Sequence, residues 1–144
     1  MSTLNNQLYI DGVVVKGIGR TFSVSIKQPT EETATLTKPE WEPLDLSSYT
    51  IQFDILGSAD GNGIVLVRKT INQISDETTE GLIREPATGE FTFVITADDT
   101  NTLGLGSYPI VIKLLDSSSG TLIHTLTEGG TKQGEFSKIT VVRA

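Results

Sequence analysis

The sequence contains no cysteine and a single histidine, His124, among its 144 residues. Without cysteine the chain cannot form a disulfide framework or a thiolate zinc site. One imidazole cannot supply the repeated histidine ligands of most catalytic zinc sites, and no motif supplies the activated serine that a Ser-His-Asp triad needs. We therefore expect a protein that is not an enzyme, with no catalytic residue, no metal and no cofactor.

Clusters of positive charge and long apolar runs are also missing. The net charge is −7, and the basic residues are scattered singly apart from Arg68-Lys69. Because phosphate backbones attract basic grooves, nucleic acid and anionic membrane surfaces are poor partners. No run approaches the roughly 18 apolar residues of a membrane span, and the polar, uncharged start does not resemble a signal peptide. We expect the chain to be made in a cytoplasm.

The sequence is rich in alternating apolar residues, which place side chains on one face of a strand. Four segments show this period of two clearly: 22–26, 49–55, 91–95 and 108–114. Three further apolar runs fit it less cleanly: 64–71, 121–127 and 135–143. Clusters of Gly, Asp, Asn and Ser separate the runs. About eight short strands with such turns predict an all-β fold, an antiparallel sandwich.

One short helical turn is expected near residues 97–103, with Thr96 as its N-cap and Asp99 in its first turn. The following Gly104-Leu105-Gly106 lacks the third glycine of a dinucleotide-binding fingerprint and follows a helical turn instead of preceding one. In immunoglobulin-like sandwiches such a turn leads into a strand whose early tyrosine bonds back to the backbone. Tyr108 fits that position, so the segment predicts an immunoglobulin-like β-sandwich and no phosphate site.

Two segments stand apart from the predicted sandwich, which we place at residues 20–144. Residues 1–19 form an N-terminal arm or hairpin, in which Asp11-Gly12 has the sequence of a two-residue turn. The arm could be the first strand pair of the sandwich, or it could lie on a neighbouring molecule. Residues 28–48 form a long loop that holds Trp41 between two prolines. Trp41 is either a binding anchor or a plug for the end of the core. The candidate protein-binding residues are Tyr9, Val13, Val14, Val15 and Trp41.

Three motifs together suggest a family. They are "LDLSSYTIQFDIL" at 44–56, "GEFTFVITADDTNTLGLGSYPIVIKLLD" at 89–116, and "GEFSKITVV" at 134–142. This pattern resembles the small immunoglobulin-like domains of tailed-phage virion proteins, and is similar to the N-terminal domain of baseplate upper proteins. The resemblance implies a structural or adaptor protein of the tail, baseplate or fibre attachment. It also implies a location in the virion, with other virion proteins and copies of the same chain as partners in a symmetric homo-oligomer.

Two alternative functions remain open at this point. A capsid decoration or head-fibre protein could have the same fold. A carbohydrate-binding module in host attachment would need an exposed aromatic platform, for which Trp41 and Tyr9 are the candidates.

Overall fold

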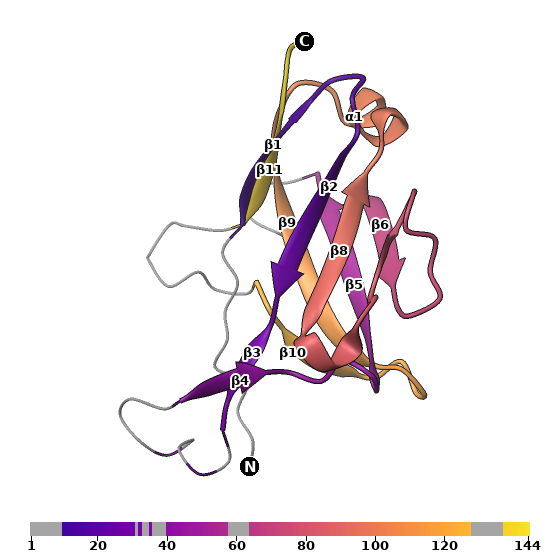
Figure 1. Ribbon diagram of the computed structural model, residues 1–144. Coiled ribbons are helices and arrows are strands. Elements are labelled where there is room, and N and C mark those ends of the chain that lie inside the picture. The colour runs from indigo at the N-terminus through magenta and orange to yellow at the C-terminus, as the bar shows by residue number, and fades with distance from the viewer. Residues whose placement is uncertain (1–9, 31, 33–34, 36–39, 58–63, 128–136) are drawn as a thin grey trace.

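The chain folds into two packed β-sheets with a short ribbon at one end (Figure 1). The computed structural model describes residues 10–30, 32, 35, 40–57, 64–127 and 137–144. Strands dominate this part of the chain, which confirms the prediction of an all-β sandwich. The only helices among the described residues are η1 (Pro86–Thr88) and α1 (Ala97–Leu103).

The larger sheet has the strand order β1-β11-β9-β5-β6, and β10 pairs with the last part of β9. Its strands are β1 (Asp11–Val15), β11 (Lys138–Val142), β9 (Gly106–Asp116), β5 (Tyr49–Leu56), β6 (Val65–Ile71) and β10 (Leu122–Thr125). All pairs are antiparallel except β1 with β11, which are parallel. The expectation of a purely antiparallel sandwich is wrong for that one pair, because β1 is an added edge strand and not half of a hairpin.

The smaller sheet has the order β2-β8-β7, formed by β2 (Arg20–Ser25), β8 (Glu90–Ile95) and β7 (Gly81–Leu82). Immunoglobulin-like sandwiches place strands B, E and D in one sheet and C, F and G in the other, and the variable type adds C′. Here β2, β8 and β7 correspond to strands B, E and D. β5 and β9 correspond to strands C and F, the β10/β11 pair corresponds to strand G, and β6 beside β5 corresponds to C′. The predicted immunoglobulin-like sandwich is confirmed.

The core lies between the sheets, where the alternating residues of the sequence meet. Phe53 of β5 stacks on Phe93 of β8 with ring centroids 4.3 Å apart, and Phe22 of β2 stacks on the same ring at 4.9 Å. Phe53 and Phe93 are both fully buried. Full burial of one such side chain contributes about 1.5–3 kcal/mol. The apolar residues of the period-two segments therefore form the core, as the sequence predicted.

The corner between β8 and β9 also follows the sequence. Thr96 caps α1 and its hydroxyl accepts from Asp99 N, while the Asp99 carboxylate accepts from Thr96 N at 2.9 Å. The Tyr108 hydroxyl donates to the main-chain oxygen of Leu103. Gly104 ends the helix with φ +76°, which a residue with a side chain rarely adopts. The prediction of a tyrosine corner instead of a phosphate cradle is confirmed.

The predicted turn at Asp11-Gly12 is wrong. Both residues belong to β1, which pairs along its whole length with β11. Gly12 has another reason to be glycine: a Cβ there would lie 2.8 Å from both Ile139 Cδ1 and Phe22 Cε1. An Asp-Gly pair marks a turn because of its backbone freedom, whereas this glycine provides room for packing. Residues 1–9, the rest of the expected arm, lie outside the described residues.

The expected long loop at 28–48 contains a two-stranded ribbon, β3 (Lys27–Pro29) paired with β4 (Trp41–Pro43). The ribbon leaves the sandwich at Ile26, whose N–H donates to Gly89 O at 2.9 Å. It returns at Leu44, whose N–H donates to Ile26 O at 3.0 Å. Figure 1 shows β3 and β4 extending beyond the end of the two sheets. Residues 31, 33–34 and 36–39 between them lie outside the described residues.

Candidate docking surfaces

The three valines proposed for partner binding lie together on β1, but they do not share one environment. Val14 points into the core and is 1% exposed, whereas Val13 is 45% exposed. Alternation along the strand explains the difference, because neighbouring side chains point to opposite faces. Val14 is therefore a core residue, and Val13 is the one whose side chain a partner can reach best.

Two carbonyls on the outer edge of β1 are already bound within the chain. Ile10 O and Lys16 N bond to β11, so by alternation Val13 and Val15 direct their main chain away from β11. Val13 O accepts from Arg20 Nη1 at 2.7 Å, and Val15 O accepts from Ile18 N at 2.9 Å. A strand added along β1 would have to displace both donors, which argues against strand addition at this edge.

Trp41 lies on β4, opposite Pro29, and is 46% exposed. It does not plug the end of the sandwich core, so that alternative is wrong. The reason is the pairing of β3 with β4, which carries this segment beyond the sheets instead of folding it over them. Figure 1 shows the ribbon at one end of the molecule and β1 toward the other, so the fold does not bring Trp41 and Val13 together. Tyr9 lies outside the described residues.

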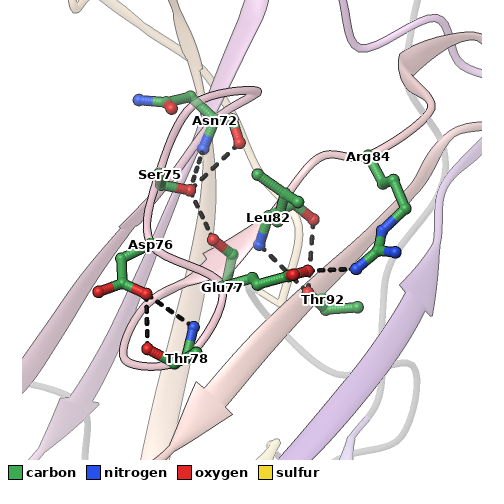
Figure 2. Close-up of polar contacts among 9 residues, drawn as sticks. Asn72, Ser75, Asp76, Glu77, Thr78, Leu82, Arg84 and Thr92 are labelled. Atoms are coloured by element: carbon green, nitrogen blue, oxygen red, sulfur yellow. Dashed lines mark hydrogen bonds and ion pairs between the residues drawn. The ribbon is translucent and has the colours of Figure 1, made fainter.

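The outer face of the smaller sheet holds a cavity of about 160 Å³ between β2, β7, β8 and residues 84–85. Two of the polar side chains around it already have partners in the same chain. Figure 2 shows Arg84 directed at the Glu77 carboxylate, with which it forms an ion pair. The Thr92 hydroxyl accepts from Leu82 N at 3.1 Å. These contacts hold the edge of the smaller sheet together. None of the residues that line the cavity is among the candidate binding residues predicted from the sequence.

Three aspartates fix turns at the ends of strands. Each carboxylate accepts from both the hydroxyl and the main-chain N–H of a Ser or Thr two residues later, and Figure 2 shows one of these turns. The pairs are Asp45 with Ser47, Asp76 with Thr78, and Asp116 with Ser118. Because these hydrogen bonds favour the charged form, the side-chain bond first and the main-chain bond second, the pKa of each aspartate is lowered. All three carboxylates serve local structure.

Two ion pairs involve neighbouring residues of β6. Arg68 binds Asp54 of β5 through Nε at 2.8 Å and Nη2 at 3.1 Å, and this hydrogen bonding, with the attraction of the charges, raises the pKa of Arg68. On the other face, the buried Lys69 Nζ lies 2.7 Å from Asp99 Oδ2 and donates to Thr79 O at 2.6 Å. Lys69 therefore ties β6 to the first turn of α1.

Sequence reasoning missed the exposed apolar residues at the start of β6. Ile64, Val65 and Leu66 are 80%, 38% and 41% exposed. The signal was present: four apolar residues in succession, 64–67, break the period of two, so they cannot all face the core. The start of β6 is apolar on both faces, but only one face of the strand packs on the core. The apolar side chains on the other face are therefore exposed to solvent or to a partner.

The described residues contain no group of three or more Asp, Glu or His that could hold a metal ion, and none of their helices is long and apolar enough to cross a membrane. His124 lies half-buried on β10, as expected for a strand histidine. Its Nε2 has no hydrogen-bond partner in the described structure.

No family model matches the chain, and no curated protein matches it either. Among solved structures, the chain is similar to the NK cell receptor Nkp44, a triggering partner in natural cytotoxicity. The two share 14% sequence identity with a TM-score of 0.43, over 96% of this chain and 100% of that chain. The immunoglobulin-like sandwich described above follows from the strand order and the tyrosine corner of this molecule.

Proposed function

We propose that this chain is a non-enzymatic structural or adaptor protein of a tailed-phage virion, in the tail, baseplate or fibre attachment, and that it acts by protein–protein docking. The observation that carries the docking function is Trp41, which is 46% exposed on a ribbon that extends beyond the sandwich. Tryptophan is enriched among the few residues that dominate binding energy at interfaces. A ribbon tied to the sandwich at its base by the bond from Ile26 N to Gly89 O presents such a side chain at low entropic cost.

The virion part of the proposal is supported by where the three sequence motifs fall in the fold. The first covers β5 and the turn before it, the second runs through β8, α1 and β9, and the third includes β11. These are neighbouring strands and the corner that joins the two sheets. The shared pattern is therefore one of architecture, as expected for a module whose role in the resembling virion proteins is assembly. The proposed partners are other virion proteins and further copies of the chain.

The virion assignment is tested by location. Gold-labelled antibodies against the recombinant chain are imaged on intact particles from the source lysate. Label at the tail tip or collar is the expected result. Label spread over the head would replace the tail function with capsid decoration, and absence of label from every particle would overturn the virion proposal.

The role of Trp41 is tested by substitution. Trp41→Ala is expected to weaken incorporation into particles at least tenfold, since loss of an interface hot spot costs about 2 kcal/mol or more. The matched control is Ile74→Ala, which removes an apolar side chain that is 92% exposed in the turn after β6. Incorporation of both variants at the wild-type level would show that the ribbon is not the docking surface.

The exposure of Trp41 also favours a second candidate, a carbohydrate-binding module, because sugars stack on exposed aromatic rings. A glycan array separates the two functions. Binding by the wild-type chain that disappears in Trp41→Ala would support carbohydrate recognition. A wild-type chain that binds no glycan, but enters particles, would leave protein docking as the function.

A further inference from the structure

The outer edge of the smaller sheet belongs to β2, whose one neighbour in that sheet is β8. Val94 N donates to Glu80 O at 3.0 Å, so Val94 of β8 directs its main chain toward β7. Because this direction alternates along a strand, Phe93 directs its main chain toward β2, where it pairs with Phe22. Phe22 therefore directs its own main chain toward β8, and its neighbours along β2 direct theirs to the outer edge.

The pairing of β2 with β8 runs from Arg20 to Ser25 without a register shift, so the alternation holds along the whole strand. Ile26 N confirms it at the end of β2, because it donates to Gly89 O at 2.9 Å on the same side as β8. The residues that direct their main chain to the outer edge are Thr21, Ser23 and Ser25. Within the described residues, their N–H and C=O groups on that side have no hydrogen-bond partner.

This edge has none of the features that usually protect an edge strand from pairing. No charged residue, proline or bulge falls between Arg20 and Lys27. On the other face of the strand, Phe22 and Val24 pack against the core but are only half-buried. One more strand beside β2 would cover both side chains and satisfy the open main-chain groups.

The surroundings admit one strand at this edge, and not a second folded sheet. Figure 1 shows β1 and β11 of the larger sheet on the open side of β2. β1 lies close to Phe22, since a Cβ on Gly12 would be 2.8 Å from Phe22 Cε1. A sheet approaching β2 edge to edge would meet β1 and β11. The described residues level with Phe22 are themselves paired with β11, so the added strand comes from another molecule.

We propose that the outer edge of β2 binds a single extended segment of a neighbouring virion protein by strand addition. Residues of the segment that pair with Thr21, Ser23 and Ser25 direct their side chains to solvent. The residues between them are apolar and cover Phe22 and Val24. The segment is uncharged along this stretch, because β2 offers no charged side chain to pair with a charge brought there. The virion identity of the partner rests on the proposed function, whereas the strand addition does not.

A short capped peptide of alternating Thr and Val is the probe, added to the full chain and followed by NMR and amide hydrogen exchange. N-methylation of its Val residues blocks the peptide edge that faces away from β2 and leaves the Thr N–H groups free to pair. N-methylation of its Thr residues instead blocks the pairing edge, and this peptide of the same composition is the control. The first peptide is expected to protect the amides of Thr21, Ser23 and Ser25, and the second is not.

A substitution in β2 tests the same contact from the protein side. Ser23→Pro removes the central open N–H but no ladder bond to β8, and proline is tolerated at such edge positions. The variant is expected to bind the first peptide about tenfold more weakly or worse, since a main-chain hydrogen bond is lost. Ser23→Ala keeps the N–H and is expected to bind as wild type does. Thermal midpoints show whether the variants are folded, and the two peptides test the wild-type chain independently of them.

Several results would overturn the proposal. They are equal protection by the two peptides, no protection by the first, and a folded Ser23→Pro variant that binds as wild type does. Protection of the Ser23 amide in the dilute chain without peptide would show that the chain itself covers this edge, which also contradicts the proposal. Peptide binding as expected, with the chain absent from every particle, would overturn the virion identity of the partner and leave strand addition in place.

Discussion

The two edges of the larger sheet differ in how they are closed. β1 carries three successive valines, yet its outward carbonyls are taken by Arg20 and by the turn at Ile18. β6 carries a similar apolar run, but among the described residues the outward main-chain groups of Arg68 have no partner. Apolar, β-branched sequence is therefore not enough to identify a docking edge. What decides is whether side chains or turns from the same chain already bind the outward main-chain groups.

The largest expected effect concerns how β6 is held in place. Lys69→Ala should lower the free energy of unfolding by about 3 kcal/mol, because it leaves the Asp99 carboxylate without its cation in a mostly buried site. Urea unfolding measures the change. Arg84→Ala is the control, since its ion pair with Glu77 is 71% and 48% exposed. That exposed pair should contribute at most about 1 kcal/mol. Equal losses in the two variants would contradict the role given to Lys69.

The next effect tests the closeness of packing at β1. Gly12→Ala should destabilise the fold by about 1–2 kcal/mol, because the new Cβ would meet two core side-chain atoms at 2.8 Å. Gly57→Ala is the matched substitution beside β6, where the nearest atoms lie at 3.5 Å, an ordinary contact distance. Thermal unfolding should therefore separate the two variants. A Gly12→Ala variant as stable as Gly57→Ala would show that β1 is not tightly packed on the sandwich.

A smaller effect is expected from removing the donor that closes β1. Arg20→Ala loses the hydrogen bond to Val13 O and the contact of the guanidinium with the Phe22 ring at 4.4 Å. The loss should be about 1 kcal/mol. Lys16→Ala removes the same charge from the turn after β1 and should change the unfolding midpoint less. Association of the Arg20→Ala variant through β1 would support the conclusion that Arg20 closes this edge in the wild-type chain.

The smallest expected effect is a dependence of the folding stability on pH. The folded-state pKa values of Asp45, Asp76 and Asp116 are lowered from the ordinary aspartate value, first by the side-chain hydrogen bond that each carboxylate accepts. A lowered pKa contributes stability above the unfolded value, and this contribution is lost as the pH falls through the folded value. Unfolding curves should therefore lose stability below about pH 4. Asp116→Asn should reduce this loss, because it removes one of the three carboxylates, and a slope equal to that of wild type would contradict this contribution.

Much of the fold could be predicted because its signals are local. Period-two alternation marked β5, β8 and β9, and the Thr96-to-Tyr108 corner depends on contacts within a few residues of sequence. The parallel pairing of β1 with β11 could not be predicted in this way, since it joins the two ends of the chain. The prediction of a turn at Asp11-Gly12 was wrong for the same reason. Gly12 is constrained by packing against Phe22 and Ile139, which are distant in the sequence.

The candidate sites were less predictable than the fold. Alternation could have separated Val14, a core residue, from Val13, but not the bond from Arg20 that closes the edge. The exposure of Trp41 depends on the pairing of β3 with β4 across the loop. No local sequence pattern predicted this pairing. The unbroken apolar run at 64–67 was visible in the sequence, but its meaning required knowing that β6 lies at an edge.

The conclusion that β6 is an open edge is tested most directly by amide hydrogen exchange of the full chain. The N–H of Arg68 faces away from β5 and is expected to exchange quickly, whereas the N–H of the neighbouring Lys69 faces β5 and is expected to be protected. Equal protection of the two amides would contradict the conclusion that β6 is the open edge of this sheet.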